Sequence, residues 1–125
     1  MPPFSIKESI VMFYYEDLSI AVPFYEDTLG LKKIYNLDWS KIYQISDTSC
    51  VGLIRENESS FHKAQPDNAV MLSIVTDEID AWYKRLKRDK RTAFIKHIYN
   101  NEDAPIRAFL VRDPGGYTIE FFQWL

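Results

Sequence analysis

The order of secondary-structure patterns is the same in the two halves of the chain, and this repeat limits the possible folds more than any other feature. In the first half, an apolar, β-rich segment at residues 10–15 precedes a helical pattern at residues 18–29. In the second half, a similar segment at residues 70–75 precedes a helical pattern at residues 78–89. A constant shift along the chain superimposes the two helical patterns although few residues are identical, so a pattern rather than a sequence is repeated.

Three further predicted strands complete each half, so the repeated unit is strand–helix–strand–strand–strand (βαβββ). These strands lie at residues 33–37, 41–45, 50–55, 93–99, 106–112 and 117–124. One such unit leaves an apolar sheet face exposed, so two units are expected to pack together around a cavity. The sequence predicts an α+β fold in which two βαβββ repeats form a curved, half-barrel mixed sheet with the helices outside. We expect a single domain over residues 1–125, with repeat one at about 8–57, a polar linker at 58–65 and repeat two at about 66–125.

Composition excludes several classes of protein. The chain has 125 residues, of which 46% are hydrophobic, and a chain of this length can bury a core without covalent staples. The single cysteine, Cys50, cannot form an internal disulfide or a paired-cysteine motif. No apolar run is long enough to cross a bilayer and the N-terminus lacks the pattern of a signal peptide, so we expect a cytoplasmic protein that binds no membrane. The net charge of −3 argues against binding of nucleic acid through its phosphate backbone.

Two motifs resemble signatures of the vicinal oxygen chelate superfamily, which includes glyoxalase I, extradiol dioxygenases and bleomycin-binding proteins. Residues 17–31 resemble D-L-x₅-F-Y-x₃-L-G-L, and residues 107–120 resemble R-x-F-x₃-D-P-x-G-x₃-E. The resemblance covers about residues 8–124 and implies a glyoxalase-like fold. Within these motifs, we interpret Gly30 as the residue that ends a helix and residues 113–116 as a hairpin turn that needs a glycine at positive φ.

The resemblance also implies where a metal would be bound. Metal-dependent members use four side chains from the first and last strands of the two repeats, and divalent ions there are held by imidazole and carboxylate groups. The corresponding positions in this sequence are Ile10, Leu53, Met71 and Glu120. Only Glu120 carries a suitable donor, so we expect no metal and no other cofactor. The alternative is one divalent metal at an atypical site that includes Glu120.

Strand alternation predicts which side chains face the cavity. If Glu120 faces it, Thr118 and Phe122 should share that face, while Ile119 and Phe121 pack against a helix. The predicted ligand-binding residues, which are mostly apolar or aromatic, are Ile10, Met12, Tyr14, Trp39, Tyr43, Leu53, Arg55, Met71, Ser73, Arg107, Phe109 and Glu120. Of these, Trp39 and Tyr43 fit a core or a dimer interface equally well. The set suits a planar or amphipathic organic molecule held by stacking and by one or two charges.

Two functions from different classes follow from this inventory. The favoured one is a small-molecule binding protein of the bleomycin-resistance type that needs no metal. The alternative is a divergent glyoxalase- or dioxygenase-type enzyme, in which Glu120 is the candidate catalytic residue and Arg55 or Arg107 stabilises an oxyanion. In either case we expect the Glu120 charge to be met by a guanidinium, by a hydroxyl donor such as Tyr14 or by a proton, because a buried carboxylate needs a partner. Arg55 is the favoured partner, and Arg107 is the second choice. The resemblance further implies a homodimer in which cavities are completed across the interface.

Overall fold

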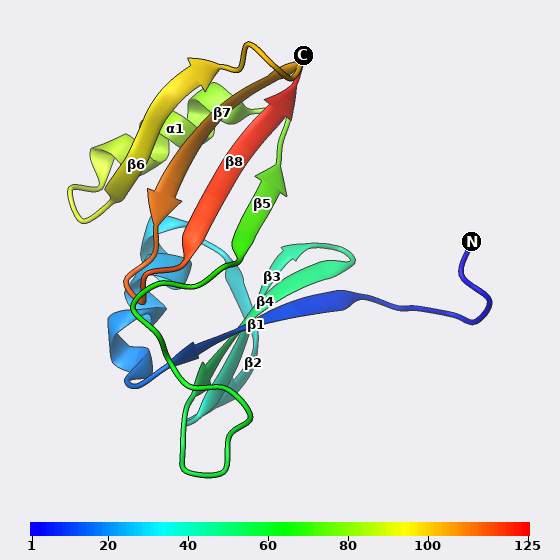
Figure 1. Cartoon of the computed structure of the whole chain (residues 1–125), viewed down its shortest axis with the longest axis vertical. Coiled ribbons are helices and arrows are strands. Elements are labelled where there is room, and N and C mark those ends of the chain that lie inside the picture. Colours follow the sequence, from blue (N-terminus) through cyan, green and yellow to red (C-terminus); the bar gives the residue numbers. More distant parts are fainter. The chain divides into compact units, whose positions relative to one another are not determined.

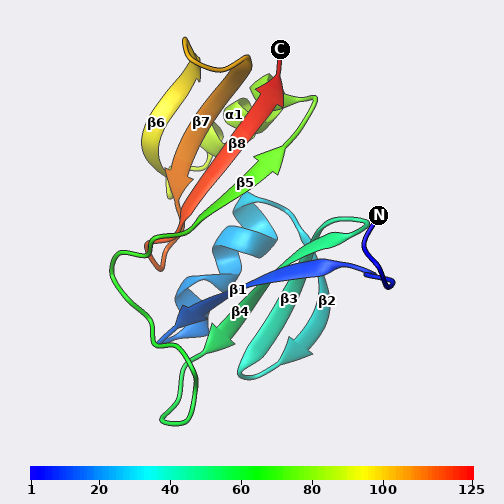
Figure 2. The same ribbon diagram turned by 45° about the vertical axis from the view of Figure 1, so that its right-hand side comes forward.

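The computed structural model describes residues 1–125 and divides the chain into two units, Met1–Ala64 and Gln65–Leu125. The boundary between the units lies within one residue of the end of the predicted linker. Each unit has a four-stranded sheet with helical residues against one of its faces (Figure 1, Figure 2). We call this face of each sheet the helix-covered face and the opposite one the helix-free face.

In the first unit, the sheet has the order β1-β4-β3-β2, and only the β1–β4 pair is parallel. Its strands are β1 (Ser9–Tyr15), β2 (Lys32–Leu37), β3 (Ser40–Ser46) and β4 (Ser49–Arg55). The register pairs Met12 with Gly52 and Phe13 with Leu53. Paired residues of neighbouring strands point to the same face, so these two rows lie on opposite faces of the sheet.

The helix predicted over residues 18–29 is instead two short segments. η1 (Leu18–Ile20) is a 3₁₀ turn and η2 (Phe24–Thr28) is a π-helical turn. Pro23, which immediately precedes η2, has helical dihedral angles but no N–H to donate to the preceding turn, so one hydrogen bond of a regular helix is missing there. The predicted end of the helical region is confirmed, because Gly30 follows it with a φ of 70°.

In the second unit, the sheet has the equivalent order β5-β8-β7-β6, and only the β5–β8 pair is parallel. Its strands are β5 (Met71–Val75), β6 (Ala93–Asn100), β7 (Ile106–Arg112) and β8 (Thr118–Trp124). The single long helix, α1 (Ile79–Arg88), packs on β7 and β8 and confirms the helix predicted at residues 78–89 (Figure 1). The βαβββ order is thus present in both units, and the fold is α+β and glyoxalase-like. With ten residues, α1 falls short of crossing a membrane, and so do the shorter helical segments.

Aromatic side chains fill the helix-covered side of both sheets. In the first unit, Tyr25 of η2 stacks on Tyr43 of β3 with ring centroids 5.9 Å apart. In the second unit, Phe109 stacks on Phe121 at 5.1 Å, and Trp82 of α1 lies 5.2 Å from the Phe121 ring. Each of these packed rings buries a large apolar surface, so the two cores are built in the same way.

A side-chain network at the edge of the first core satisfies the polar end of Tyr43. The Tyr43 hydroxyl donates to Glu26 Oε1 at 2.9 Å, and Lys33 Nζ lies 2.7 Å from the same oxygen. The Lys33 ammonium holds the pKa of Glu26 below its usual range. Burial, together with the carboxylate beside it, raises the pKa of Tyr43. The network therefore keeps a charged Glu26 and a neutral Tyr43.

The turn between β7 and β8 has the predicted form. Asp113 is 3% exposed, and its Oδ1 accepts hydrogen bonds from the backbone N–H of Gly115 at 2.9 Å and of Tyr117 at 2.8 Å. Gly116 has a φ of 91°, and a Cβ at this position would lie 2.6 Å from the carbonyl oxygen of Pro66. The prediction that this turn needs a glycine at positive φ is confirmed, with a close backbone approach as a second reason.

Candidate functional site

A serine–glutamate pair lies on the helix-free face of the second sheet, on the edge strand β5 and its neighbour β8. The register of β5 on β8 places Ser73 beside Glu120, and Ser73 Oγ donates to Glu120 Oε1 at 2.8 Å. On the other face of β8, Ile119 and Phe121 are 0% and 1% exposed. The alternation predicted along β8 is therefore confirmed, and Glu120 points away from α1.

Apolar side chains flank the Ser73–Glu120 pair along the same two strands. Met71 and Val75, on either side of Ser73, are 48% and 53% exposed. Phe122 follows Glu120 on this face and meets the Trp124 ring edge to face at 4.9 Å. This much exposed apolar surface around one carboxylate is typical of a binding surface rather than of an ordinary solvated sheet.

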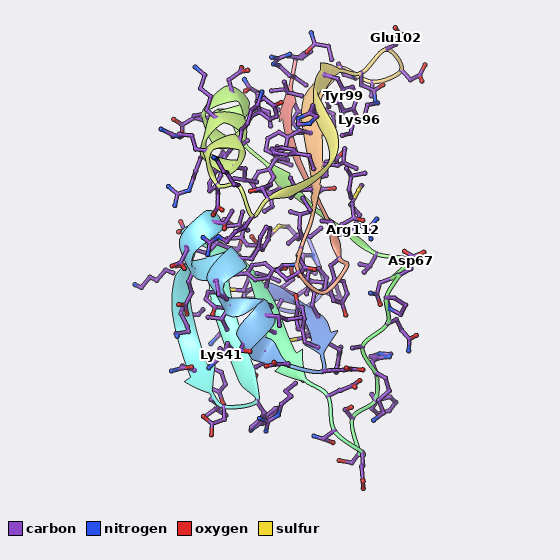
Figure 3. The ribbon with its side chains drawn as sticks, turned by 90° about the vertical axis from the view of Figure 1, so that its left-hand side faces the viewer. Lys41, Asp67, Lys96, Tyr99, Glu102 and Arg112 are labelled. Atoms are coloured by element: carbon purple, nitrogen blue, oxygen red, sulfur yellow. The ribbon has the colours of Figure 1, made fainter.

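The neighbouring strands β7 and β6 add an apolar side chain and two cations to this face. Leu110 is the register partner of Glu120 on β7, and Lys96 is the register partner of Leu110 on β6. Lys96 Nζ lies 3.7 Å from the centre of the Tyr99 ring, and both residues are labelled in Figure 3. Arg112, at the end of β7, donates from Nη1 to the carbonyl oxygen of Gly116 at 3.0 Å.

The β6 residues of this face, Lys96 and Tyr99, are not among the residues predicted from the sequence. The pairing of β6 with β7 is irregular between Phe94 and Lys96 and again between Lys96 and Tyr99. Each irregularity interrupts the strict alternation of faces, so the side to which Lys96 and Tyr99 point cannot be read from their spacing. No local sequence signal marks these two positions.

Five predicted ligand-binding residues lie on the helix-covered faces instead, and Arg55 is one of them. Tyr43, Leu53 and Phe109 are each 0% exposed and belong to the two cores. Arg107 pairs with Asp80 of α1, at 3.0 Å between Nη2 and Oδ1. The prediction that these side chains point into the cavity is wrong. Alternation shows which residues of one strand share a face, but the register between strands decides which residues of the next strand lie on that face.

Glu120 therefore has a different partner from the one expected. Its carboxylate accepts a hydrogen bond from Ser73 and forms no ion pair, since the Arg107 guanidinium binds Asp80 and also donates to Asn100 Oδ1 at 3.0 Å. Arg55 belongs to the first unit, on the helix-covered side, and its guanidinium makes no hydrogen bond or ion pair. The pairing of Glu120 with Arg107 is thereby corrected.

The remaining predicted residues of the first unit lie on its helix-free face or in a turn. Ile10, Met12 and Tyr14 alternate on β1 away from the core, and the Tyr14 ring meets the His62 ring edge to face at 5.3 Å. Trp39 lies in the turn between β2 and β3 and is 48% exposed. The structure thus keeps Ile10, Met12 and Tyr14 together in one unit and Met71, Ser73 and Glu120 together in the other.

The residues present do not fit the divalent metal that the resemblance implies. In the first unit, Met12 and Gly52 are register partners in the same way as Ser73 and Glu120, and neither offers an oxygen or nitrogen side-chain donor. No group of three or more His, Cys, Asp and Glu side chains that could hold a metal ion occurs in the chain. His97 points to the helix-covered side, where its Nδ1 and the Tyr83 hydroxyl are 2.8 Å apart. Glu120 therefore carries the one carboxylate at the positions where metal ligands are expected. A carboxylate, the thioether of a methionine and the hydroxyl of a serine together bind a divalent metal poorly.

The thiol of Cys50 is also unsuited to chemistry. Cys50 is 3% exposed on β4, and burial raises the pKa of its thiol. A buried, protonated thiol is a weak nucleophile. The chemically distinctive group of the helix-free faces is therefore the carboxylate of Glu120.

The sequence profile of the glyoxalase/bleomycin resistance protein/dioxygenase superfamily matches residues 9–121. The chain belongs to this superfamily. Solved structures of the superfamily share its fold, and one is a glyoxalase/bleomycin resistance protein/dioxygenase from Nocardioides. That protein is 19% identical with a TM-score of 0.78, and the match covers 100% of this chain and 87% of the other. No curated protein matches the chain.

Two further solved structures show the range of proteins that are similar to this superfamily member. Lactoylglutathione lyase from Agrobacterium tumefaciens is 20% identical with a TM-score of 0.70, covering 98% of this chain and 95% of the other. TioX from Micromonospora sp. ML1 is 17% identical with a TM-score of 0.76, covering 94% of this chain and 98% of the other. At these identities the likeness shows the fold, and the ligand has to be argued from the side chains of this chain.

Proposed function

We propose that this superfamily member binds a small planar or amphipathic organic molecule on the helix-free face of the second sheet, without a catalytic metal. The observation that carries the proposal is the environment of Glu120. Its carboxylate accepts one hydrogen bond, from the neutral Ser73, and lies among partly exposed apolar side chains. An ionised carboxylate has about four acceptor positions, so most of its hydrogen-bonding capacity is available to a ligand.

The surroundings of Glu120 indicate what the ligand carries. Apolar surface at Met71, Phe122 and Trp124 favours a flat or hydrophobic body, because contact with it removes apolar area from water. The free positions on the Glu120 carboxylate favour a donor group, best a positively charged amine. We therefore expect aromatic amines to bind better than aromatic acids of the same size.

A matched pair of probes tests this proposal. Tryptamine and indole-3-propionate carry the same ring and opposite charges, and isothermal titration calorimetry in the presence of a chelator compares them. We expect tryptamine to bind about tenfold more tightly, which corresponds to about 1.4 kcal/mol. Glu120→Gln should remove this preference and leave the fold intact, because Gln keeps the hydrogen bond with Ser73.

The controls separate this function from the enzymatic alternative. Lys90→Gln removes an exposed charge on the helix side of the same unit and should change neither affinity. Equal affinities of the two probes for the wild type, or a requirement for added divalent metal, would contradict the proposal. Turnover of a hemithioacetal or a catechol would replace binding by catalysis as the function. The homodimer implied by the resemblance stays a prediction, which sedimentation velocity tests.

A further inference from the structure

A cavity lies on the helix-covered side of the first sheet, opposite Ile10 and Met12, and the proposed function makes no use of it. It has a volume of about 480 Å³ and opens between the helical turns and the ends of β3 and β4. Leu18, Val22 and Pro23 form its apolar wall. The volume is within the range of about 300–1,000 Å³ that is usual for small-molecule sites.

Two cations from neighbouring strands lie at this cavity. Lys41 of β3 is the register partner of Leu53, and Arg55 lies two residues beyond Leu53 on β4. The two cations are thus diagonal neighbours on one face, which places their Cα atoms roughly 7–8 Å apart in ordinary sheet geometry. A carboxylate can contact both side chains at once, because both are long and point to the same side.

Two hydrogen bonds hold the Lys41 ammonium in place. Its Nζ donates to Asn36 Oδ1 at 2.6 Å and to the carbonyl oxygen of Leu37 at 3.1 Å, and both acceptors are neutral (Figure 3 labels Lys41). The Arg55 guanidinium makes no hydrogen bond or ion pair at all. A pre-positioned ammonium and a guanidinium with free donors line the same cavity. This pair suits a carboxylate ligand, since the guanidinium can bind it with two hydrogen bonds.

Two carboxylates line the same cavity and also lack cationic partners. Asp17 accepts a hydrogen bond from the backbone N–H of Ser19 at 2.9 Å, and the side-chain and backbone hydrogen bonds from Ser19 lower the pKa of Asp17. Asp38, in the turn between β2 and β3, has no side-chain partner. The cavity therefore presents two positive and two negative groups that form no ion pair with one another, whereas the ion pairs of the chain lie elsewhere.

We propose that this cavity binds a small zwitterion of the amino-acid type. Its carboxylate lies against Lys41 and Arg55, and its ammonium group faces Asp17 and Asp38. An aliphatic side chain of the ligand packs on the apolar wall. A ligand with only a negative charge would be attracted by the two cations but repelled by both aspartates. A ligand with only a positive charge would be attracted by the aspartates but repelled by Lys41 and Arg55.

Leucine and its two singly charged derivatives test this assignment. Leucine carries both charges, N-acetylleucine keeps only the carboxylate, and leucinamide keeps only the amine. In ¹⁵N-resolved NMR titrations at millimolar concentration, leucine should shift the amide signals of residues 17–22 and 38–41 and should bind about tenfold more tightly than either derivative. Arg55→Gln and Asp38→Asn should each weaken leucine binding about tenfold.

Two controls make the result interpretable. Lys7→Gln removes an exposed charge from the same unit and should leave leucine binding unchanged. Glu120→Gln should also leave it unchanged, which separates this cavity from the helix-free face of the second sheet. The Arg55 and Asp38 side chains make no hydrogen bond or ion pair, so both variants are expected to fold.

Three outcomes would overturn the proposal. The first is the absence of shifts at these residues with all three probes. The second is binding of N-acetylleucine or leucinamide as tight as that of leucine, which would make the cavity a site for one charge only. The third is unchanged leucine affinity in both Arg55→Gln and Asp38→Asn.

Discussion

The two units of the chain share one topology but offer different chemistry at equivalent positions of their helix-free faces. In the second unit, the register partners on the parallel strand pair are Ser73 and Glu120, and in the first unit they are Met12 and Gly52. A Cβ at Gly52 would lie 2.3 Å from Met12 Sδ, so a thioether folds over the glycine where the other unit has a carboxylate. The two units therefore share a fold, but the first unit has no counterpart of the Ser73–Glu120 pair.

The helix-covered faces show the opposite behaviour, because they are alike in both units. Each is a set of packed aromatic rings, with Tyr25 on Tyr43 in one unit and Phe109 on Phe121 in the other. A sheet must bury one face against its helix to be stable, which holds the residue type at these positions to large apolar rings. The helix-free face is under no such requirement, so polar, flexible or absent side chains are tolerated there.

The largest expected effect is on the helix-covered face of the second unit. Phe109→Ala should destabilise the protein by about 3–5 kcal/mol, because it leaves a cavity beneath Phe121 and Tyr83. Met71→Ala on the helix-free face of the same sheet should cost less than about 1 kcal/mol, since Met71 is 48% exposed. Urea denaturation followed by circular dichroism measures both, and similar losses would refute the division into a stabilising and a tolerant face.

A smaller effect is expected where Met12 covers Gly52. Gly52→Ala should cost about 1–3 kcal/mol by overpacking, because the new methyl group has to displace the Met12 thioether. In a Met12→Ala background the same change should cost much less, and a double-mutant cycle in urea gives the difference. Equal costs in the two backgrounds would mean that Met12 does not occupy this position in solution.

The next effect concerns pH and the first core. The pKa of Glu26 is lowered, chiefly by Lys33, so the charged form stabilises the fold above the ordinary glutamate pKa of 4.5. This stabilisation should be lost as pH falls from about 4.5 through the lower folded-state value of Glu26. Glu26→Gln should therefore lose less unfolding free energy than the wild type over that range, as urea titrations at successive pH values would show. Glu102→Gln, an exposed change in the other unit (Figure 3), should titrate like the wild type.

The smallest effect on stability is expected at the proposed site itself. Glu120→Leu should change the free energy of unfolding by less than about 0.5 kcal/mol. The substitution leaves no guanidinium without its ion-pair partner, and the Ser73 hydroxyl can form a hydrogen bond with water instead. This differs from what an arginine partner would imply, since an unpaired buried arginine costs several kcal/mol. A measured loss above about 2 kcal/mol would show that Glu120 is buried against a partner in solution.

Much of the fold follows from short-range features of the sequence. Each strand lies within a residue or two of its predicted range, and α1 and the Asp113 turn are where the pattern places them. The exception is the first helical region, in which Pro23 separates two short turns. There the apolar spacing was correctly recognised, but the missing N–H of one residue outweighed the periodicity.

The candidate site was predictable only along single strands. Glu120, Ser73 and Met71 could be placed on one face because alternation within a strand is a local property. Arg107 and Leu53 could not, because their facing depends on which residue of the next strand they oppose. The resemblance in residues 107–120 correctly identified the superfamily, which the profile match over residues 9–121 shows independently.

The sequence by itself therefore determined the order of elements, the turns and the chemistry available to the protein, since periodicity, capping and turn formation act over a few residues. The tertiary structure decided which of those side chains share a face. Register between strands and the irregular pairing of β6 place Lys96 beside Leu110 and Tyr99 beside Ala108. The position of the helices places Tyr43 and Phe109 in the cores. These are long-range choices, in which a shift of one residue exchanges the two faces of a strand.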